Sequence, residues 1–512
     1  MKRPTTRVTD THPSWSVALH AAAFGLAAMC GCTTTSPAGP FADVQGTIAE
    51  RTGYHVEWRR LAPDIQDSLD RLLACELTAD AAVQVALLSN RRLQAEYARL
   101  GVAQAELVQA GLLRNPIFSG TIRWAPGSQR MFDFSVVQDF LDVLLIPLEV
   151  SVAKSELESV KLEVTGRVID LASDTKRAFY TYAANEELVG TWKSILLAAE
   201  SSYEMAEQLR LAGNLTELEV LNEQAPYERA KLELARAESR RVTHRERLNR
   251  LMGLWGEATK WSAAEDLPPM PDSPVATEHI ERRALASSLD LARAYAELEA
   301  AATRFRVMEV MQIVPRFELG ASAEFEKEET FKLVEKRRRD GSEYELEEVP
   351  GSTEAWSGGE FSVALPLFDQ GQAARAAGRS TIERLYEQYT ALAIEIRSAA
   401  REAAFRAANA RARARFHEEV FVPLRETITA ETHLRYNAMF DGVFQLLRAK
   451  EREIDARRDH VEALREYWLA NTDLEQLLMG RVPPEFRETM VSQCERQDMS
   501  GSRRARRGEA HD

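Results

Sequence analysis

The chain has 512 residues, of which 28% are charged, and its formal net charge at pH 7 is −14. This acidic balance, without a dominant basic stripe, argues against a nucleic-acid-binding protein. Long tracts rich in Ala, Glu, Arg and Leu and poor in Gly predict long helices. The histidines are scattered, and we find no metal-ligand spacing, glycine-rich phosphate loop or nucleophile elbow, so the sequence predicts no enzyme, metal or cofactor site.

The beginning of the chain has the features of an export signal. Three basic residues, Lys2, Arg3 and Arg7, precede a mostly apolar run from Val17 to Met29. This run is too short to span a bilayer as a helix, but it is long enough for the core of a secretory signal. We therefore expect residues 1–31 to be a signal peptide.

Two cysteines follow the apolar run directly. A cysteine after a small residue at this place resembles a bacterial lipobox, whose cysteine receives the lipid. Cys32, which follows a glycine, fits this pattern better than Cys30, and Thr33 in the next position resembles the pattern for transfer to the outer membrane. The alternative, a signal peptide with chance cysteines, stays open, as does a disulfide between the remaining Cys75 and Cys494.

A helix and a β-hairpin are expected next. Residues 33–40 read as a tether within an N-terminal segment that extends over 32–76. A helix begins near Leu77, with Thr78 as its cap, and ends before Pro116, because the residue before a proline disfavours helix. Apolar residues then alternate with polar ones over 117–124 and 132–136, on either side of a turn at 126–128. This pattern predicts a β-hairpin with one aromatic and one polar face.

Long helices fill the rest of the first half, residues 77–254. A helical pattern runs from Pro147 to about Leu211, and its apolar residues at 157, 160, 164, 168 and 171 have an average spacing of 3.5, the coiled-coil period. The pattern breaks at Gly213-Asn214 and resumes from Thr216 to about Leu251. Residues 255–280 contain four prolines and read as a linker.

The same series of elements starts again in residues 281–480. The expected order is a helix, a strand, a charged loop, a strand and two long helices, with a break in the second long helix near Met439 to Gly442. These elements occupy residues 281–314, 317–325, 327–351, 360–365, 372–415 and 424–478. Residues 481–512 read as a disordered tail.

Short motifs recur in the same order in both halves of the chain, which indicates a duplicated unit. Phe134 and Phe361 each begin a Phe-Ser-Val triplet, at an offset of 227 (361 − 134 = 227). The prolines that open the first strand of each hairpin, Pro116 and Pro315, have an offset of 199 (315 − 116 = 199). The difference between the two offsets (227 − 199 = 28) falls in the charged loop, so the second copy carries an enlarged polar hairpin loop.

Two such units supply only four amphipathic strands. An open sheet that exposes aromatic residues to lipid needs closure, because unpaired strand edges are not tolerated in hydrocarbon. Four strands are fewer than the smallest membrane barrels contain, so we expect several chains to contribute to one barrel. The strand residues expected to face lipid are Phe118, Ile122, Phe132, Phe134, Phe317, Leu319, Phe325 and Phe361.

Four segments resemble motifs of the TolC-type outer-membrane efflux proteins. Residues 77–82 resemble that family's first helix, and residues 365–372, with Pro366, Asp369 and Gly371, resemble its transition from strand to periplasmic helix. Residues 211–221 and 436–447 resemble the two copies of its periplasmic hairpin tip. The resemblance covers about residues 77–480, and the tip residues that it implies are Gly213, Asn214, Thr216, Glu219, Met439, Asp441, Gly442 and Gln445.

The resemblance implies a mainly α fold with a transmembrane β-barrel contribution. Two tandem repeats of a coiled-coil helical hairpin plus a β-hairpin would assemble as a homotrimer with a twelve-strand barrel and an α-helical periplasmic tunnel. The implied function is the outer-membrane channel of a tripartite efflux system, held in the outer membrane by lipid on Cys32. Its implied partners are a periplasmic adaptor (membrane fusion protein), which docks at the tips near the gate, and an inner-membrane pump of the RND type. No cofactor is implied.

The second tip departs from the family pattern. Met439 stands where the family usually has Gly, and Gly442 where Ser or Thr is common. Gln445 and Arg448 occupy positions that are often acidic, whereas Glu219 in the first copy keeps an acid, so the departure weakens the expectation of an acidic ring at the gate. Two alternatives remain: a periplasmic coiled-coil lipoprotein would lack the strands, and a membrane-fusion adaptor would have one helical hairpin.

Overall fold

A computed structural model describes residues 36–59, 65–124, 130–139, 141–264, 266–313, 317–327, 330–338, 341–349, 353–363 and 371–486. The unit that begins at Pro37 contains all the helices and strands below. The expected signal peptide, Cys30 and Cys32, and the transition residues Pro366 and Asp369, lie outside the described residues. Cys75 is a free, exposed cysteine, and Cys494 lies outside the described part of the chain.

The described part of the first half of the chain contains six α-helices. They are α2 (Ala38–Thr52), α3 (Ile65–Leu73), α4 (Ala79–Ser89), α5 (Arg91–Ala110), α6 (Leu141–Leu211) and α7 (Glu217–Met252). The expected cap of α4 is confirmed, since the Thr78 side chain accepts a hydrogen bond from the Ala81 amide. The single helix expected over 77–114 is wrong, because Asn90 adopts an extended conformation, ends α4 and caps α5 with its side chain.

The second half follows the same order. It contains α8 (Ile280–Ser287), α9 (Leu289–Ile313), α10 (Gln372–Phe416), a π-helical turn η2 (His417–Phe421), α11 (Val422–Asn437) and α12 (Val443–Leu478), after a short 3-10 turn η1 (Gly256–Thr259). The expected α10 and the break before α12 are confirmed. The helix expected over 281–314 is broken at Ser288, which is extended as Asn90 is.

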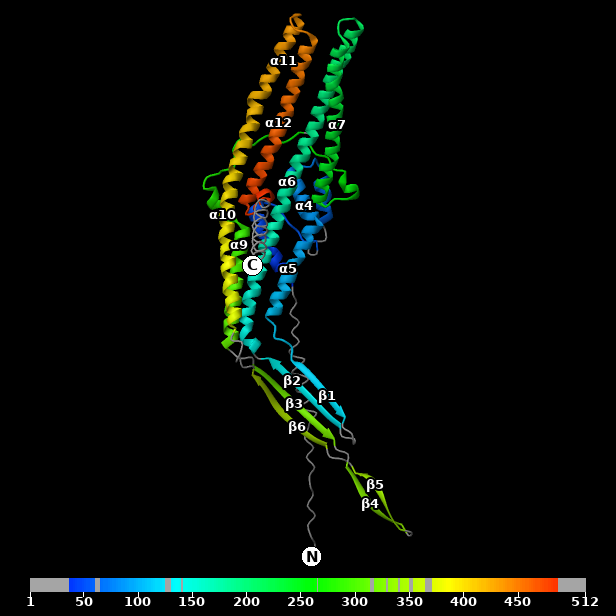
Figure 1. Ribbon diagram of the computed structural model, residues 1–512, viewed down its shortest axis with the longest axis vertical. Helices are drawn as coiled ribbons and strands as arrows, with labels where there is room; N and C mark the ends of the chain where they lie inside the picture. The colour runs from blue at the N-terminus through cyan, green and yellow to red at the C-terminus, as the bar shows by residue number, and fades with distance from the viewer. Residues whose placement is uncertain are drawn as a thin grey trace, which may run out of the picture. The chain divides into compact units, whose positions relative to one another are not determined.

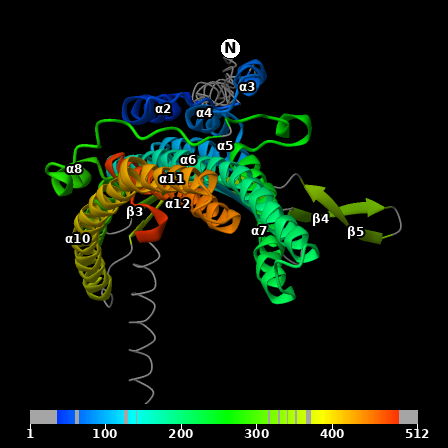
Figure 2. The same ribbon diagram turned by 90° about the horizontal axis from the view of Figure 1, so that it is seen from above.

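The helices lie along a curve when they are seen from above. Figure 2 shows α6, α11 and α12 between α7 and α10, with α2, α3 and α4 on the convex side. The core under them includes Tyr182, Leu248, Met252 and Trp261, and the Trp261 indole donates a 2.8 Å hydrogen bond to Asn249. Among the described residues, none of the helices is both long enough and apolar enough to cross a membrane.

Four antiparallel strands form one sheet at the far end of the helices from the hairpin tips (Figure 1). The strands are β1 (Ile117–Trp124), β2 (Arg130–Asp139), β3 (Phe317–Lys327) and β6 (Thr353–Val363), in the order β1-β2-β3-β6. Strand β2 of the first repeat pairs with β3 of the second, so the two repeats share the sheet. Within the described residues, β1 and β6 are its outer strands.

The charged segment between β3 and β6 is not only a loop, as the sequence suggested. It contains a separate two-stranded sheet of β4 (Thr330–Arg338) and β5 (Gly341–Val349). The register pairs Lys332 with Glu347 and Lys336 with Glu343.

Residues 481–486 and 38–40, which were expected in the disordered tail and in the tether, belong to the folded part of the chain. Arg481, Val482 and Phe486 are buried, because the two apolar side chains join the cluster around Ile280 and Ala284 and the guanidinium is held by carboxylates. At the other end of the chain, α2 already begins at Ala38, within the predicted tether, and its Pro40 and Phe41 are buried.

Candidate functional site

The first hairpin tip is a tight reversal between α6 and α7. Gly213 has a positive φ of 78°, which favours glycine. Its amide donates to the Arg210 carbonyl at 2.9 Å, and the Asn214 amide donates to the Leu209 carbonyl at 2.8 Å, so the two bonds form a Schellman motif that satisfies the last carbonyls of α6. The positions predicted for this tip therefore lie at its turn.

A capping box starts the helix that leaves the first tip. The Thr216 amide donates to the Glu219 carboxylate at 2.7 Å, and the Glu219 amide donates to the Thr216 hydroxyl at 3.4 Å. The hydrogen bonds from Thr216 lower the pKa of Glu219, because they stabilise the charged carboxylate. Glu219 thus has a local structural partner at the tip.

The second tip repeats this geometry at nearly the same offset as the other repeated motifs (439 − 213 = 226). Met439 takes the place of Gly213, with a φ of 63°. Its amide donates to the Tyr436 carbonyl and the Phe440 amide donates to the Arg435 carbonyl, both at 2.9 Å. The break therefore falls at Met439 itself, and this left-handed conformation costs a non-glycine residue about 1–2 kcal/mol.

Other residues differ between the two tips. Gly442 has an extended backbone and caps α12, and its amide donates to the Gln445 side chain at 3.0 Å. Arg435 forms a two-bond ion pair with Asp441, with its Nε 2.7 Å and its Nη2 3.3 Å from the carboxylate oxygens. The matching positions in the first tip are leucines (435 − 226 = 209 and 441 − 226 = 215), which cannot form such a pair.

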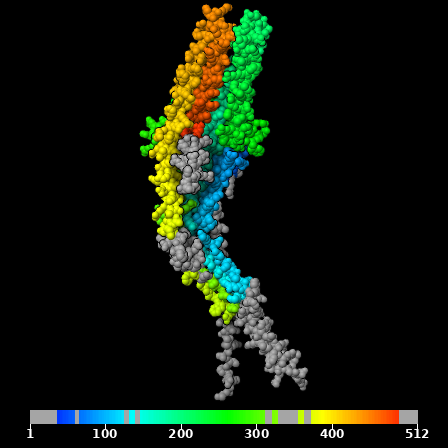
Figure 3. Space-filling view, viewed as in Figure 1, coloured from blue at the N-terminus to red at the C-terminus, as the bar shows by residue number. Residues whose placement is uncertain are grey.

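The second tip is also the more apolar at its end. Met439 is 93% exposed and Phe440 is 79% exposed. Figure 3 shows the two hairpins side by side, with their tips separate at the ends. These two apolar side chains project from the end of the hairpin and do not pack into the core. Such exposed apolar side chains are suited to contact with another protein.

An ion pair near the tips joins the two repeats. Arg448 on α12 lies with its Nη2 3.2 Å from Glu223 Oε1 on α7, and the Ser202 hydroxyl of α6 donates to the other carboxylate oxygen at 2.7 Å. Glu223 was not among the residues predicted for the tip. It could have been predicted from its position one helical turn beyond Glu219, on the same face of the helix.

The aromatic face of the sheet agrees with the predicted alternation. The strand registers place all eight residues that were expected to face lipid on one face. Phe118 is 67% exposed and Phe361 is 73% exposed, and Phe134 contacts the rings of Phe118 and Phe325 at centroid distances of 6.0 and 6.5 Å. On the opposite face Ser119 and Ser135 share a 2.7 Å hydrogen bond, so the sheet is amphipathic.

The start of α10 marks the transition from strand to helix. Gly371 has a φ of 71° and directly precedes Gln372, so the chain enters the long helix through a left-handed residue. Of the three transition residues that were predicted, Gly371 is the one that the structure describes.

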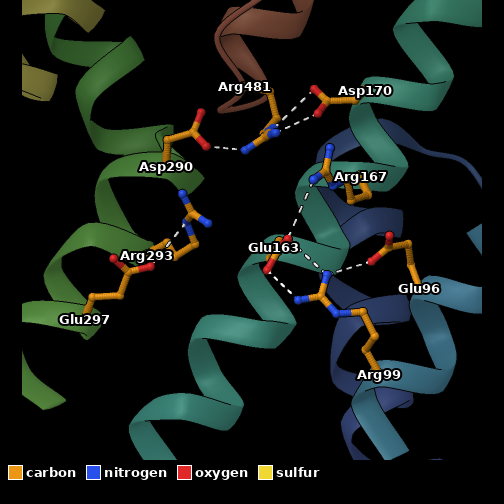
Figure 4. A network of polar contacts seen from close by, with 9 residues as sticks. All are labelled: Glu96, Arg99, Glu163, Arg167, Asp170, Asp290, Arg293, Glu297 and Arg481. Atoms are coloured by element: carbon orange, nitrogen blue, oxygen red, sulfur yellow. Dashed lines mark hydrogen bonds and ion pairs between the residues drawn. The ribbon is translucent and has the colours of Figure 1, made fainter. Parts of the chain in front are cut away.

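Ion pairs near the middle of the helices join the two repeats and also join helices within the first repeat (Figure 4). Arg481, after α12, contacts Asp170 on α6 at 2.6 Å and also Asp290 on α9. Arg99 on α5 forms a two-bond pair with Glu163 on α6, at 3.0 and 2.9 Å. Gly166 allows this packing, since a Cβ there would lie 2.9 Å from the Arg481 side chain.

The described residues contain no group of three or more His, Cys, Asp or Glu side chains placed to hold a metal ion. What the structure combines is an amphipathic sheet with two outer edges, long paired helices, and two reversals of equal geometry at the far end.

Solved structures with the same fold were found, although neither a family model nor a curated protein matches the sequence. The CmeC outer membrane channel of Campylobacter jejuni is 14% identical with a TM-score of 0.60, over 84% of this chain and 90% of that one. The outer membrane protein VceC of Vibrio cholerae is 16% identical with a TM-score of 0.60, over 83% and 98%. The MtrE outer membrane channel of Neisseria gonorrhoeae is 15% identical with a TM-score of 0.58, over 79% and 89%. The expected TolC-type architecture is therefore confirmed as a fold.

Proposed function

We propose that this chain, which has the fold of outer-membrane channel proteins, is the outer-membrane channel subunit of a tripartite efflux system. The observation that carries the proposal is the sheet, which has an exposed aromatic face and two outer strands, β1 and β6, at one end of the long helices. An aromatic face of this kind is suited to lipid, and a strand edge in hydrocarbon must be paired.

Three copies are the number that fits a conduit. Two copies would give eight strands, and a barrel of eight is about filled by its own side chains. Three copies give about twelve, which leaves a lumen while each β6 pairs with the β1 of a neighbour. The homotrimer is thus supported by the four-strand sheet of one chain.

The helices would continue this conduit into the periplasm. Helix α6 has 71 residues, which corresponds to about 105 Å at 1.5 Å per residue. We assign the hairpin tips to the docking of a periplasmic adaptor and to the gate, since Met439 and Phe440 are exposed there and Arg448 pairs with Glu223 nearby. The inner-membrane pump, of the RND type, supplies the energy, and the channel is passive.

Lipid on Cys32 would hold the N-terminus at the inner leaflet of the outer membrane. The support for this is the apolar run followed by a cysteine, and a lipobox is read by the export machinery before folding. Mass spectrometry of the mature N-terminal peptide tests it, and a peptide that begins elsewhere or carries no lipid contradicts it.

The membrane assignment is tested by extraction and size. We expect the protein to stay in outer membranes after alkaline carbonate and to run as a trimer in mild detergent. A carbonate-released monomer would favour a periplasmic coiled-coil lipoprotein or adaptor, the alternative to a channel. Efflux itself is tested by a deletion strain, which should become more sensitive to at least one compound in drug and metal panels; an unchanged strain contradicts it.

A further inference from the structure

The internal repeat creates two equivalent junctions where a long helix ends beside a helix start. Gly253 after α7 and Gly480 after α12 match in the two repeats (480 − 253 = 227), and both have a positive φ, of 68° and 103°. Ser89 and Ser287 match as well (287 − 89 = 198), and a Cβ on either glycine would collide with the carbonyl of the neighbouring serine. The backbone is therefore packed in the same way at both junctions.

Opposite charges meet at the second junction. Asp290 lies in the first turn of α9, where a negative charge is favoured by the helix dipole. Arg481 pairs with Asp290 and with Asp170, and its side chain is only 9% exposed. Each charge at this junction thus has a partner within the chain.

The first junction has the opposite sign at the same position. Arg92 matches Asp290 (290 − 198 = 92), and Leu254 matches Arg481 (481 − 227 = 254). Arg91 and Arg92 place two cations in the first turn of α5. This first turn contains no acidic residue. Cations are disfavoured at the N-terminus of a helix. The charge at this position is therefore favourable in the second repeat and unfavourable in the first.

A groove of about 690 Å³ lies at this first junction, which we call the junction groove. Arg91 and Arg92 line it from α5, and Arg247 and Arg250 line it from the end of α7. All four are exposed, and none of them forms an ion pair with another described residue. A fifth arginine, Arg167, is 3.7 Å from Glu163.

Three carboxylates line the same groove, fewer than its five arginines, and each also pairs with an arginine that does not line the groove. Arg99 lies 2.8 Å from Glu96, Arg481 2.6 Å from Asp170 and Arg177 2.7 Å from Asp174. The groove therefore carries a surplus of positive charge.

This surplus affects neighbouring groups. Burial and the charge of Arg91 lower the pKa of Arg59. Burial, together with the charges of Arg247, Arg465 and Arg240, lowers the pKa of His244 on α7. Like charges thus repel one another across this region, and an anion in the groove would relieve the repulsion.

We propose that the junction groove binds a ligand with several phosphate groups. Guanidinium groups bind phosphate oxygens through two parallel hydrogen bonds, and phosphate monoesters carry close to two charges at neutral pH. Four unpaired arginines from two elements around one groove match such a ligand better than a single carboxylate. The site lies within one copy of the chain, so it does not depend on the channel function.

Isothermal titration calorimetry of the full chain in a nonionic detergent, at constant ionic strength, tests this site with tripolyphosphate as probe. We expect saturable binding that Arg92→Ala with Arg250→Ala weakens at least tenfold. The matched control, Arg229→Ala with Arg236→Ala, removes two exposed arginines of α7 that do not line the groove and should leave the dissociation constant unchanged. A second pair, Arg91→Gln with Arg247→Gln, should weaken binding as the first does.

Thermal unfolding without ligand separates binding from folding. The groove variants should be at least as stable as the wild type, because they remove repulsion. A second titration with dihexanoylphosphatidylglycerol, below its critical micelle concentration, distinguishes a lipid headgroup from a soluble phosphate. Tripolyphosphate binding that is lost in both groove variants and kept in the control supports the site. No tripolyphosphate binding, binding of phosphatidylglycerol alone, or equal weakening by the control, overturns it.

Discussion

The first hairpin tip reverses the chain at Gly213, whereas the second does so at Met439, and the same pair of backbone hydrogen bonds closes both turns. Glycine adopts the left-handed conformation without cost, and methionine does not. The second tip contains instead an Arg435–Asp441 ion pair that spans the turn. The two tips thus have the same backbone geometry with different residues. The second tip, where a methionine bears the cost of the left-handed conformation, also exposes Met439 and Phe440.

The largest effect is expected at the junctions, where the two repeats differ in charge. Arg481→Ala leaves Asp170 and Asp290 without their main partner in a largely buried site, which should destabilise the protein by about 3–5 kcal/mol. Thermal unfolding measures the loss. Leu254→Ala, at the matching position of the first junction, serves as the comparison, and an equal loss in both variants would show that the ion pairs are not the cause.

Exchanging the turn residues tests the comparison of the tips. Gly213→Met should destabilise the first tip by about 1–2 kcal/mol, because a side chain raises the energy of the left-handed conformation. Met439→Gly should stabilise the second tip by a similar amount, because it removes that side chain. Amide hydrogen exchange of each tip, followed by mass spectrometry, reports the local opening. Unchanged exchange in both variants would contradict the role of the turn conformation.

The N-caps of the helices that leave the two tips also differ, since Thr216 caps α7 and Gly442 caps α12. Thr216→Ala removes the capping hydroxyl of α7 and should cost about 1 kcal/mol, whereas Gly442→Ser should gain only a few tenths of a kcal/mol in α12. Hydrogen exchange in the first turn of each helix measures both changes. A larger change in α12 than in α7 would contradict this ranking.

A small effect of pH is expected at the first tip. The pKa of Glu219 is lowered in the folded protein, so its contribution to stability is complete above the unfolded value and is lost as the pH falls through the folded value. Glu219→Gln should remove this acid dependence from the exchange of the first tip. If the dependence persists in the variant, another group causes it.

Local patterns in the sequence were sufficient to predict the strands of the four-stranded sheet and the positions of both tips, but not β4 and β5. Alternating aromatic residues define the sheet face around Phe118 and Phe134, and a glycine, or a break in the helical period, marks a reversal. The breaks at Asn90 and Ser288 were missed, because the flanking residues continue a helical pattern and the break depends on a cap. The junction groove could not be predicted, since its arginines come from two segments that are far apart in the chain, 91–92 and 247–250.

We propose that copies of this chain close one barrel through their outer strands. Electron cryo-microscopy of the full-length protein in lipid nanodiscs tests this assembly. We expect three copies around one axis, with β6 of each copy paired to β1 of the next and the aromatic face around Phe118 and Phe361 against lipid. A single copy with an open sheet, or an assembly in which β1 and β6 stay unpaired, would contradict it.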